Sequence, residues 1–219
     1  TSNQGLTYDV EVLPDTSHRS RLNIILPTIE LKKIYGGIST ALKCGKQIYD
    51  KGNFSSIRII ITTEATSIKA VSGLSKRYGV DFSFESSTAT IEASSYQVCN
   101  LFAETDRLIR VGSNDIFLTT AWWTAHIGKS INEQKNELYK SSRPIYYLIQ
   151  DFECGFYEWG YDYVRAYNTY SDPNIIAIIN SLPLHKFMVE RFDFRKSYLV
   201  PDKLNATLSR ILDERSETI

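Results

Sequence analysis

The segment of this sequence with the strongest candidates for catalytic residues runs from Gln150 to Trp159, directly after a short apolar run. It carries two carboxylates close together, Asp151 and Glu153, followed by a cluster of aromatic side chains. Aromatic neighbours can lower the local dielectric and shift the pKa of a carboxyl group, as acid or base chemistry requires. Asp151 is therefore the first candidate for a catalytic residue. The alternative is structural, because an Asp in this position also serves as the N-cap of a helix.

A second candidate is the glycine pair Gly36 and Gly37, which stands immediately before a helical pattern. Glycine lets a ligand approach the backbone closely, and the unpaired N–H groups at a helix N-terminus attract an anion such as a phosphate. The spacing is not the Gly-x-Gly-x-x-Gly of dinucleotide-binding folds, so a nicotinamide cofactor is not indicated. A simple turn explains the pair equally well.

Two adjacent tryptophans, Trp122 and Trp123, follow another apolar run. Aromatic faces stack on sugar rings and bases, so a tryptophan that lines a cleft favours a carbohydrate or nucleotide ligand. Packing of both rings in the core is the alternative. The nearby string Gly128-Lys129-Ser130 resembles the end of a phosphate-binding loop, but the glycine required five positions earlier is Trp123. We therefore interpret Lys129 as a solvated helix residue.

The amino-acid composition argues against nucleic acid as a binding partner and against a membrane-spanning segment. The chain has 219 residues, 25 of them basic and 25 acidic, so it carries no formal net charge and no basic tract that would bind nucleic acid. No apolar stretch approaches the roughly 18 residues of a membrane-spanning helix, and the first residues are polar, so we expect a cytoplasmic protein. The three cysteines are far apart and predict neither a disulfide nor a zinc site.

The elements that must position the candidate residues follow one repeated order. Apolar runs that predict strands cover residues 22–26, 57–61, 115–119, 145–149 and 174–179. Helical patterns follow them, over residues 36–49, 67–78 with Gly79 as C-cap, 122–140, an aromatic-rich stretch after Gly155, and 184–192. Strands that are apolar on both faces and alternate with helices are typical of a parallel sheet covered on both sides. The predicted class is α/β, doubly wound.

Two further features complete the organisation. Residues 82–93 alternate between apolar and polar and indicate strand structure, although the pattern does not place it in the sheet. In an open parallel sheet, ligands bind outside the carboxyl ends of the strands. The three candidate segments are all strand-to-helix loops, which is where such a site is expected.

At these loops the chain resembles the family 4-like bacterial glycosyltransferases of GT-B fold, and most closely the rhamnosyltransferases of surface-layer glycan assembly. The segments that carry the resemblance are RLNIILP at 21–27, YGGISTAL at 35–42, TAWWTA at 120–125, and YLIQDFE at 147–153 with GFY at 155–157. The resemblance spans about residues 21–195. It covers the N-terminal, acceptor-side half of such an enzyme.

For the fold, the resemblance implies a Rossmann-like domain over residues 21–200, with a mainly parallel sheet and helices on both faces, as one half of a GT-B fold. Residues 1–20 would form an extended lead-in. Residues 201–219 would form a helix or linker toward a second domain that binds the donor.

For function, the resemblance implies a nucleotide-sugar-dependent glycosyltransferase of cell-surface polysaccharide biosynthesis. The favoured donor is dTDP-rhamnose, the acceptor is an oligosaccharide, and no metal or other cofactor is implied. The enzyme would be cytoplasmic, with peripheral association at the inner face of the membrane, and the fragment alone would be inactive. The alternatives are a non-catalytic carbohydrate- or nucleotide-binding α/β module, or a flavodoxin-like ligand sensor.

The resemblance also implies roles for particular residues. Gly36 and Gly37 would approach the donor diphosphate from across the cleft. Asp151 and Gln150 would face the transferred sugar, at a strand end where related retaining enzymes often carry a histidine. The residues implied at the acceptor are Trp122, Trp123, Glu153, Phe156 and Tyr157.

Overall fold

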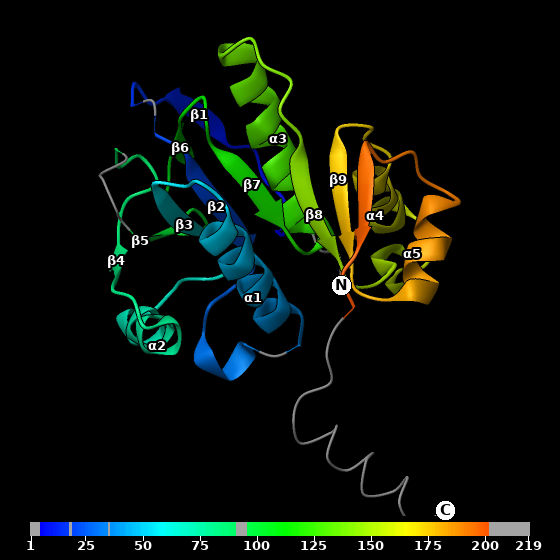
Figure 1. The fold of residues 1–219 in the computed structure, drawn as a ribbon, viewed down its shortest axis with the longest axis horizontal. Coiled ribbons are helices and arrows are strands. Elements are labelled where there is room, and N and C mark those ends of the chain that lie inside the picture. The colour runs from blue at the N-terminus through cyan, green and yellow to red at the C-terminus, as the bar shows by residue number, and fades with distance from the viewer. Residues whose placement is uncertain (1–4, 18, 35, 91–95, 202–219) are drawn as a thin grey trace, which may run out of the picture.

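A computed structural model describes residues 5–17, 19–34, 36–90 and 96–201 (Figure 1). Its centre is an eight-stranded sheet in the order β10-β9-β8-β7-β2-β3-β5-β4, in which every neighbouring pair is parallel. The strands are β2 (Arg21–Leu26), β3 (Ser56–Ile61), β4 (Phe82–Phe84), β5 (Tyr96–Asn100), β7 (Ile116–Thr119), β8 (Ile145–Ile149), β9 (Ile175–Ile179) and β10 (Lys196–Leu199). The predicted α/β class with a parallel, doubly wound sheet is confirmed.

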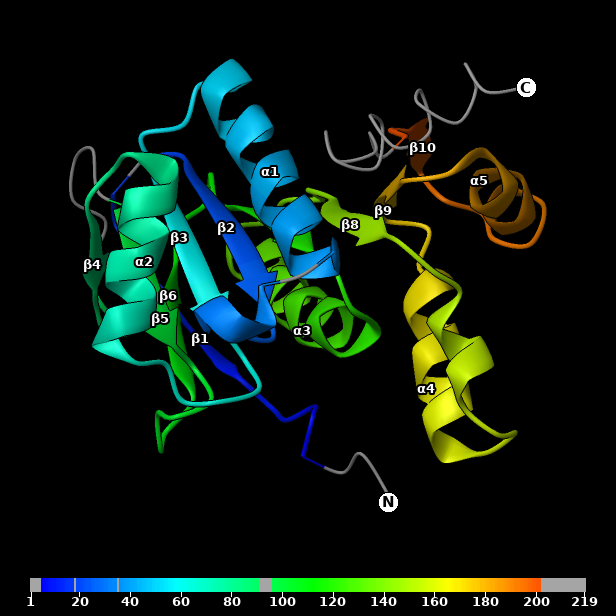
Figure 2. The same ribbon diagram turned by 90° about the horizontal axis from the view of Figure 1, so that it is seen from below.

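Helices cover both faces of this sheet (Figure 2). On one face lie α1 (Gly36–Lys51) and α2 (Ile68–Tyr78), and on the other lie α3 (Trp122–Leu138), α4 (Tyr161–Tyr170) and α5 (Leu182–Val189). Two short 3-10 helices, η1 (Leu31–Lys33) and η2 (Glu153–Phe156), interrupt the loops after β2 and β8. In the part of the chain that the structure describes, none of the helices has the length and apolar character needed to cross a bilayer.

The alternation of side chains along the central strand explains the two cores. In β2, Leu22, Ile24 and Leu26 join the cluster beneath α1 and α2, whereas Ile25 joins the cluster beneath α3. All six residues of β2 and of β3 are buried. A strand covered on both faces has no solvent-facing side, which is why apolar residues predominate in these strands and why their polar residues, such as Asn23 and Arg58, are buried as well.

A second, two-stranded parallel sheet lies on the face of α3. It pairs β1 (Glu11–Pro14) with β6 (Leu108–Val111), and β1 falls within the residues expected to form an extended lead-in. The Gln134 side chain of α3 holds it, because Nε2 donates to the carbonyl of Val10 at 2.7 Å and Oε1 accepts from the N–H of Val12 at 3.2 Å. The packing begins before β1, because Leu6 and Tyr8 contact the core and the hydroxyl of Tyr8 donates to the carbonyl of Thr62 at 3.0 Å.

The strand structure expected over residues 82–93 is confirmed only at β4, an edge strand of the main sheet, and is wrong for residues 85–90, which form a loop with a turn. Part of that expected stretch lies outside the described residues. The helix or linker expected after Pro201 lies outside them too.

The order of the strands reverses at the centre of the sheet. From β2 the chain proceeds to β3 on one side, and from β7 it proceeds to β8 on the other side. The loops that leave β2 and β7 therefore lead in opposite directions at the carboxyl edge, and this switch point is the usual ligand position in such folds.

Candidate functional site

The side chain of Gln150, just beyond β8, connects the segments that follow β2 and β7 at this switch point. Its Nε2 donates to the carbonyl oxygen of Gly37 at 3.1 Å and to Oγ1 of Thr120 at 2.8 Å. Gly37 is in the first turn of α1, and Thr120 follows β7. Three chain segments that are far apart in sequence thus meet at one point of the carboxyl edge.

The two glycines at the start of α1 have different surroundings. A Cβ on Gly37 would lie 3.1 Å from Nε2 of Gln150, a tight contact that the amide would relieve by shifting a few tenths of an ångström. Gly36 has a φ of +21° and faces open space. Gly37 therefore lies directly against this amide, while Gly36 leaves the helix terminus accessible.

Asp151 is exposed at the end of β8. Its Oδ1 accepts from the backbone N–H of the next residue, Phe152, at 2.8 Å. The N-cap position of the following 3-10 helix belongs to Phe152. This contact of the Asp151 side chain is local to the turn, and the carboxylate remains open to solvent.

Glu153 has a different environment, although it is only two residues away. Its Oε2 accepts from the backbone N–H of Trp122 at 2.6 Å, at the N-terminus of α3. Burial raises the pKa of Glu153 to about 7, and Asp151 raises it further, while the bond from Trp122 opposes the shift. This carboxylate therefore attaches the loop after β8 to the adjoining helix.

The two tryptophans have separate positions. Trp122 is fully buried, and its Nε1 donates to the hydroxyl of Tyr157 at 2.9 Å. Trp123 is half-buried and packs edge to face on Trp122, with ring centroids 5.9 Å apart. Of the two, Trp123 is therefore the one with a surface that a ligand can reach.

Three exposed aromatic side chains, here called the aromatic patch, lie along η2 and the start of α4. Phe156 is 66% exposed, Trp159 is 83% exposed and Tyr161 is 71% exposed. The sequence had pointed to Phe156 but not to Trp159 and Tyr161 as ligand-binding residues. The density of aromatic residues in this stretch was the only sign of them in the sequence. The order of residue types along the chain does not show which aromatic rings face solvent.

Tyr170 is a further residue that the sequence did not single out. It is fully buried in α4, and its hydroxyl accepts from the N–H of Glu153 at 3.3 Å and donates to the carbonyl of Asp151 at 3.4 Å. Its ring stacks on Tyr147 of β8 with centroids 5.5 Å apart. Tyr170 thus holds the backbone of the loop that presents both carboxylates.

The arrangement brings together an amide, a hydroxyl, an exposed carboxylate and a helix N-terminus. A depression beside them is lined by Asp151, Phe152, Ser181, Leu184 and others, with α5 forming its far wall. Donors and acceptors beside apolar walls suit a polyhydroxylated ligand. Among the described residues, no group of three or more His, Cys, Asp or Glu side chains is placed to hold a metal ion.

Lys129, the residue of the phosphate-loop-like string, is away from this edge in α3. It forms ion pairs with Asp172 at 3.4 Å and with Glu133 at 3.8 Å, and its side chain is partly exposed. These contacts agree with its interpretation as a helix surface residue.

Comparison with known proteins identifies the family. A search of curated proteins finds no match. The family model described as "WsaF, N-terminal domain" matches residues 21–182, which include β2, the glycine pair, the tryptophan pair and the loop after β8. WsaF is a rhamnosyltransferase of surface-layer glycan synthesis, with a GT-B fold in glycosyltransferase family 4. Because the match covers most of the chain and all three candidate loops, this chain belongs to the WsaF N-terminal domain family.

Proposed function

We propose that this chain is the acceptor-side domain of a nucleotide-sugar-dependent rhamnosyltransferase of cell-surface polysaccharide biosynthesis. The observation that carries the proposal is the link made by Gln150 between Gly37 and Thr120 at the centre of the sheet. It assembles the loops of the carboxyl edge into one surface, with the carboxylate of Asp151 exposed beside it. Membership of the WsaF N-terminal domain family supports the same function.

The chemistry of glycosyl transfer suits these groups. A departing diphosphate needs stabilisation of negative charge, and the sugar develops positive charge in an oxocarbenium-like transition state. In our proposal the start of α1, at Gly36 and Gly37, approaches the diphosphate, because N–H groups at a helix N-terminus favour an anion. Asp151 and Gln150 face the sugar, where a carboxylate offsets the positive charge.

The acceptor would lie along the aromatic side of this edge. Trp123, Phe156 and Tyr157 provide partly or largely exposed rings for an oligosaccharide. Trp122 and Glu153 contribute from behind the surface, since one holds Tyr157 and the other holds the loop on α3.

The proposal also includes a second protein domain and a sugar donor, neither of which is part of the described structure. A second domain would bind the donor, which we propose is dTDP-rhamnose, and the complete enzyme would work in the cytoplasm at the inner face of the membrane without a metal ion. Transfer requires both sides of the cleft. We therefore expect the 219-residue chain alone to bind a rhamnose oligosaccharide but to show no turnover of dTDP-rhamnose.

This expectation is tested by NMR titration of the chain with a rhamnose oligosaccharide and by a transfer assay on the same sample. We expect resonance shifts at Trp123 and Phe156, and loss of binding in Gln150→Leu, which removes the amide between the loops. Gln47→Leu, at an exposed position of α1, is the matched control and should bind normally. Absence of glycan binding, or turnover by the chain alone, would contradict the proposal.

A second candidate function is a non-catalytic carbohydrate-binding module, which the exposed aromatic patch favours. The two candidates differ in what happens when the chain is joined to a donor-binding domain. The acceptor-side domain of a transferase would then transfer sugar, and this activity would depend on Asp151. A binding module would keep its glycan affinity and show no transfer.

A further inference from the structure

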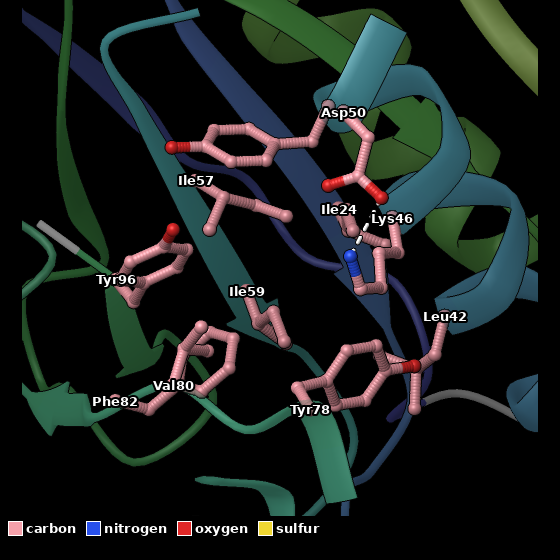
Figure 3. Close-up of a pocket in the computed structure, with 11 residues that line it drawn as sticks. Ile24, Leu42, Lys46, Asp50, Ile57, Ile59, Tyr78, Val80, Phe82 and Tyr96 are labelled. Atoms are coloured by element: carbon pink, nitrogen blue, oxygen red, sulfur yellow. Dashed lines mark hydrogen bonds and ion pairs between the residues drawn. The ribbon is translucent and has the colours of Figure 1, made fainter. Parts of the chain in front are cut away.

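The depression beside Asp151 has the size of a ligand-binding pocket. Its volume is about 450 Å³ and it is open to solvent, with the loop after β8 on one side and α5 on the other. This volume is within the range of pockets that hold small molecules. The space between α1 and α2 in Figure 3 is different, because the rings of Tyr78, Phe82 and Tyr96 pack on one another there. It measures only about 40 Å³, which is room for water-sized groups.

Three polar side chains line the depression at the strand ends. Nε2 of Gln150 uses its two hydrogens in the bonds to Gly37 and Thr120, so a ligand would meet Oε1 of this amide as an acceptor. The carboxylate of Asp151 is exposed and can accept further hydrogen bonds. Ser181, the N-cap residue of α5, makes no capping hydrogen bond with its side chain, so its hydroxyl can donate or accept. This part of the lining suits a ligand with several hydroxyl groups.

The other residues that line the depression are apolar. They are Phe152, Pro183, Leu184 and Phe187, here called the apolar wall. The rings of Phe152 and Phe187 lie with their centroids 5.0 Å apart, and Phe152 also stacks on the buried ring of Tyr170. The core thus fixes the position of the wall. A hydroxyl group held against it would lose hydration without gaining a hydrogen bond, because none of its side chains carries a donor or an acceptor.

From these features we infer that the depression binds a 6-deoxyhexose, and that Leu184 and Phe187 select it through its C6 methyl group. The hydroxyl groups of the sugar meet the three polar side chains, and the methyl group contacts the apolar wall. A hexose with a hydroxyl at C6 would press that hydroxyl against the same wall. The inference rests on the proposed function, in which Asp151 faces the transferred sugar, and it adds the residues that distinguish this sugar from others.

Methyl α-L-rhamnoside and methyl α-L-mannoside are suitable probes, because they differ only in the hydroxyl at C6. In NMR titrations of the 219-residue chain, we expect the rhamnoside to bind about tenfold more tightly or better. Its C6 methyl group should show intermolecular NOEs to the methyl groups of Leu184 and to the ring of Phe187. Equal affinity for the two glycosides, or absence of these NOEs, would overturn the inference.

A polar variant and a matched control locate the selection on α5. Leu184→Asn introduces a hydrogen-bonding group into the apolar wall and should reduce the preference for the rhamnoside by about tenfold. Leu182→Asn makes the same change at an exposed position of α5 that does not line the depression, and should keep the preference. An unchanged ratio of affinities in folded Leu184→Asn would overturn the inference. The two glycosides on the unmodified chain decide the question if Leu184→Asn does not fold.

The selection of the sugar and the proposed function fail in different ways. If the chain binds a rhamnose oligosaccharide but does not distinguish the two glycosides, the selection by α5 is wrong and the proposed function stands. If the chain selects the rhamnoside but transfers no sugar when joined to a donor-binding domain, the proposed transferase function is wrong and the sugar site stands.

Discussion

Two carboxylates that are neighbours in the sequence have opposite surroundings at the scale of single residues. The side chain of Asp151 is exposed and accepts a hydrogen bond from the adjacent Phe152 N–H, whereas Glu153 is largely buried against the N-terminus of α3. The exposed carboxylate is free to meet a ligand. The buried one stabilises the loop that carries both.

The role proposed for Asp151 can be tested in a two-domain protein that includes the donor-binding half. Asp151→Asn should lower kcat by about tenfold to a hundredfold, because it removes the negative charge that faces the sugar. Its Oδ1 still accepts from the N–H of Phe152, so the Tm should change little. Asp193→Asn, at an exposed position, is the control for loss of a carboxylate. Unchanged kcat in Asp151→Asn would remove this residue from the catalytic machinery.

Glu153 makes stability depend on pH. Burial raises its pKa from 4.5 to about 7 in the folded chain, so between these pH values the folded state retains a proton that the unfolded state has lost. The free energy of unfolding therefore falls as pH rises, by about 1–3 kcal/mol between about pH 5 and pH 8 for this group. Glu153→Gln keeps the acceptor for Trp122 without the ionisation, and should abolish that part of the fall.

Urea unfolding at a series of pH values measures this effect. Glu158→Gln, at an exposed position of the same loop, is the matched control and should keep the pH dependence of the unmodified chain. Equal pH dependence in Glu153→Gln and the unmodified chain would show that Glu153 is already ionised when folded at pH 5.

At the scale of elements, two helices are capped in different ways. In α2 the caps are local: Oγ of Ser67 accepts from the N–H of Ala70 at 3.1 Å, and Gly79 ends the helix with a φ of +66°. In α3 the N-cap residue Ala121 has no side-chain acceptor, and Glu153 reaches the helix terminus from the loop after β8. The first arrangement is visible in sequence, and the second is not.

The local cap of α2 leads to a stability prediction. Ser67→Ala removes the acceptor for the N–H of Ala70 and should lower the free energy of unfolding by about 1 kcal/mol. Ser72→Ala makes the same chemical change at an exposed position inside α2, where alanine has the better helix propensity, and should be neutral or slightly stabilising. Urea unfolding of both variants provides the comparison, and equal stability of the two would contradict the capping role.

At the scale of the whole molecule, a buried charged network joins the main sheet to the smaller one. Arg21 Nη2 lies 2.8 Å from Asp115 Oδ2, and Nζ of Lys135 donates to the carbonyl of Asp115 at 2.9 Å. Arg21 and Arg58 both donate to the carbonyl of Arg110 in β6, at 2.9 Å and 3.0 Å. These cationic side chains and Asp115 are buried, so each depends on its partners.

Removal of the single charge of Asp115 should therefore destabilise the molecule strongly. Asp115→Asn leaves Arg21 and Arg58 buried without this counter-charge, and we expect the free energy of unfolding to fall by about 3–5 kcal/mol. The double variant Arg21→Met with Asp115→Leu removes both charges of the closest pair and should be more stable than Asp115→Asn. Urea unfolding measures both, and a loss below about 1 kcal/mol in Asp115→Asn would mean that the network contributes little.

Features that depend on contacts between neighbouring residues can be predicted from the sequence, whereas features that depend on contacts between distant segments require the tertiary structure. Apolar runs such as that of β2 and the caps of α2 depend on neighbours along the chain, so the α/β class and the parallel sheet could be predicted from the sequence. The strand β5, whose residues Gln97 and Asn100 are polar but buried, has no such pattern, because its burial comes from distant segments that cover its two faces: Val98 joins the cluster beneath α1 and α2, and Cys99 joins the cluster on the opposite face. Only the tertiary structure joined Gln150 to Gly37 and Glu153 to Trp122, since these contacts form between loops that the folded sheet brings to one edge.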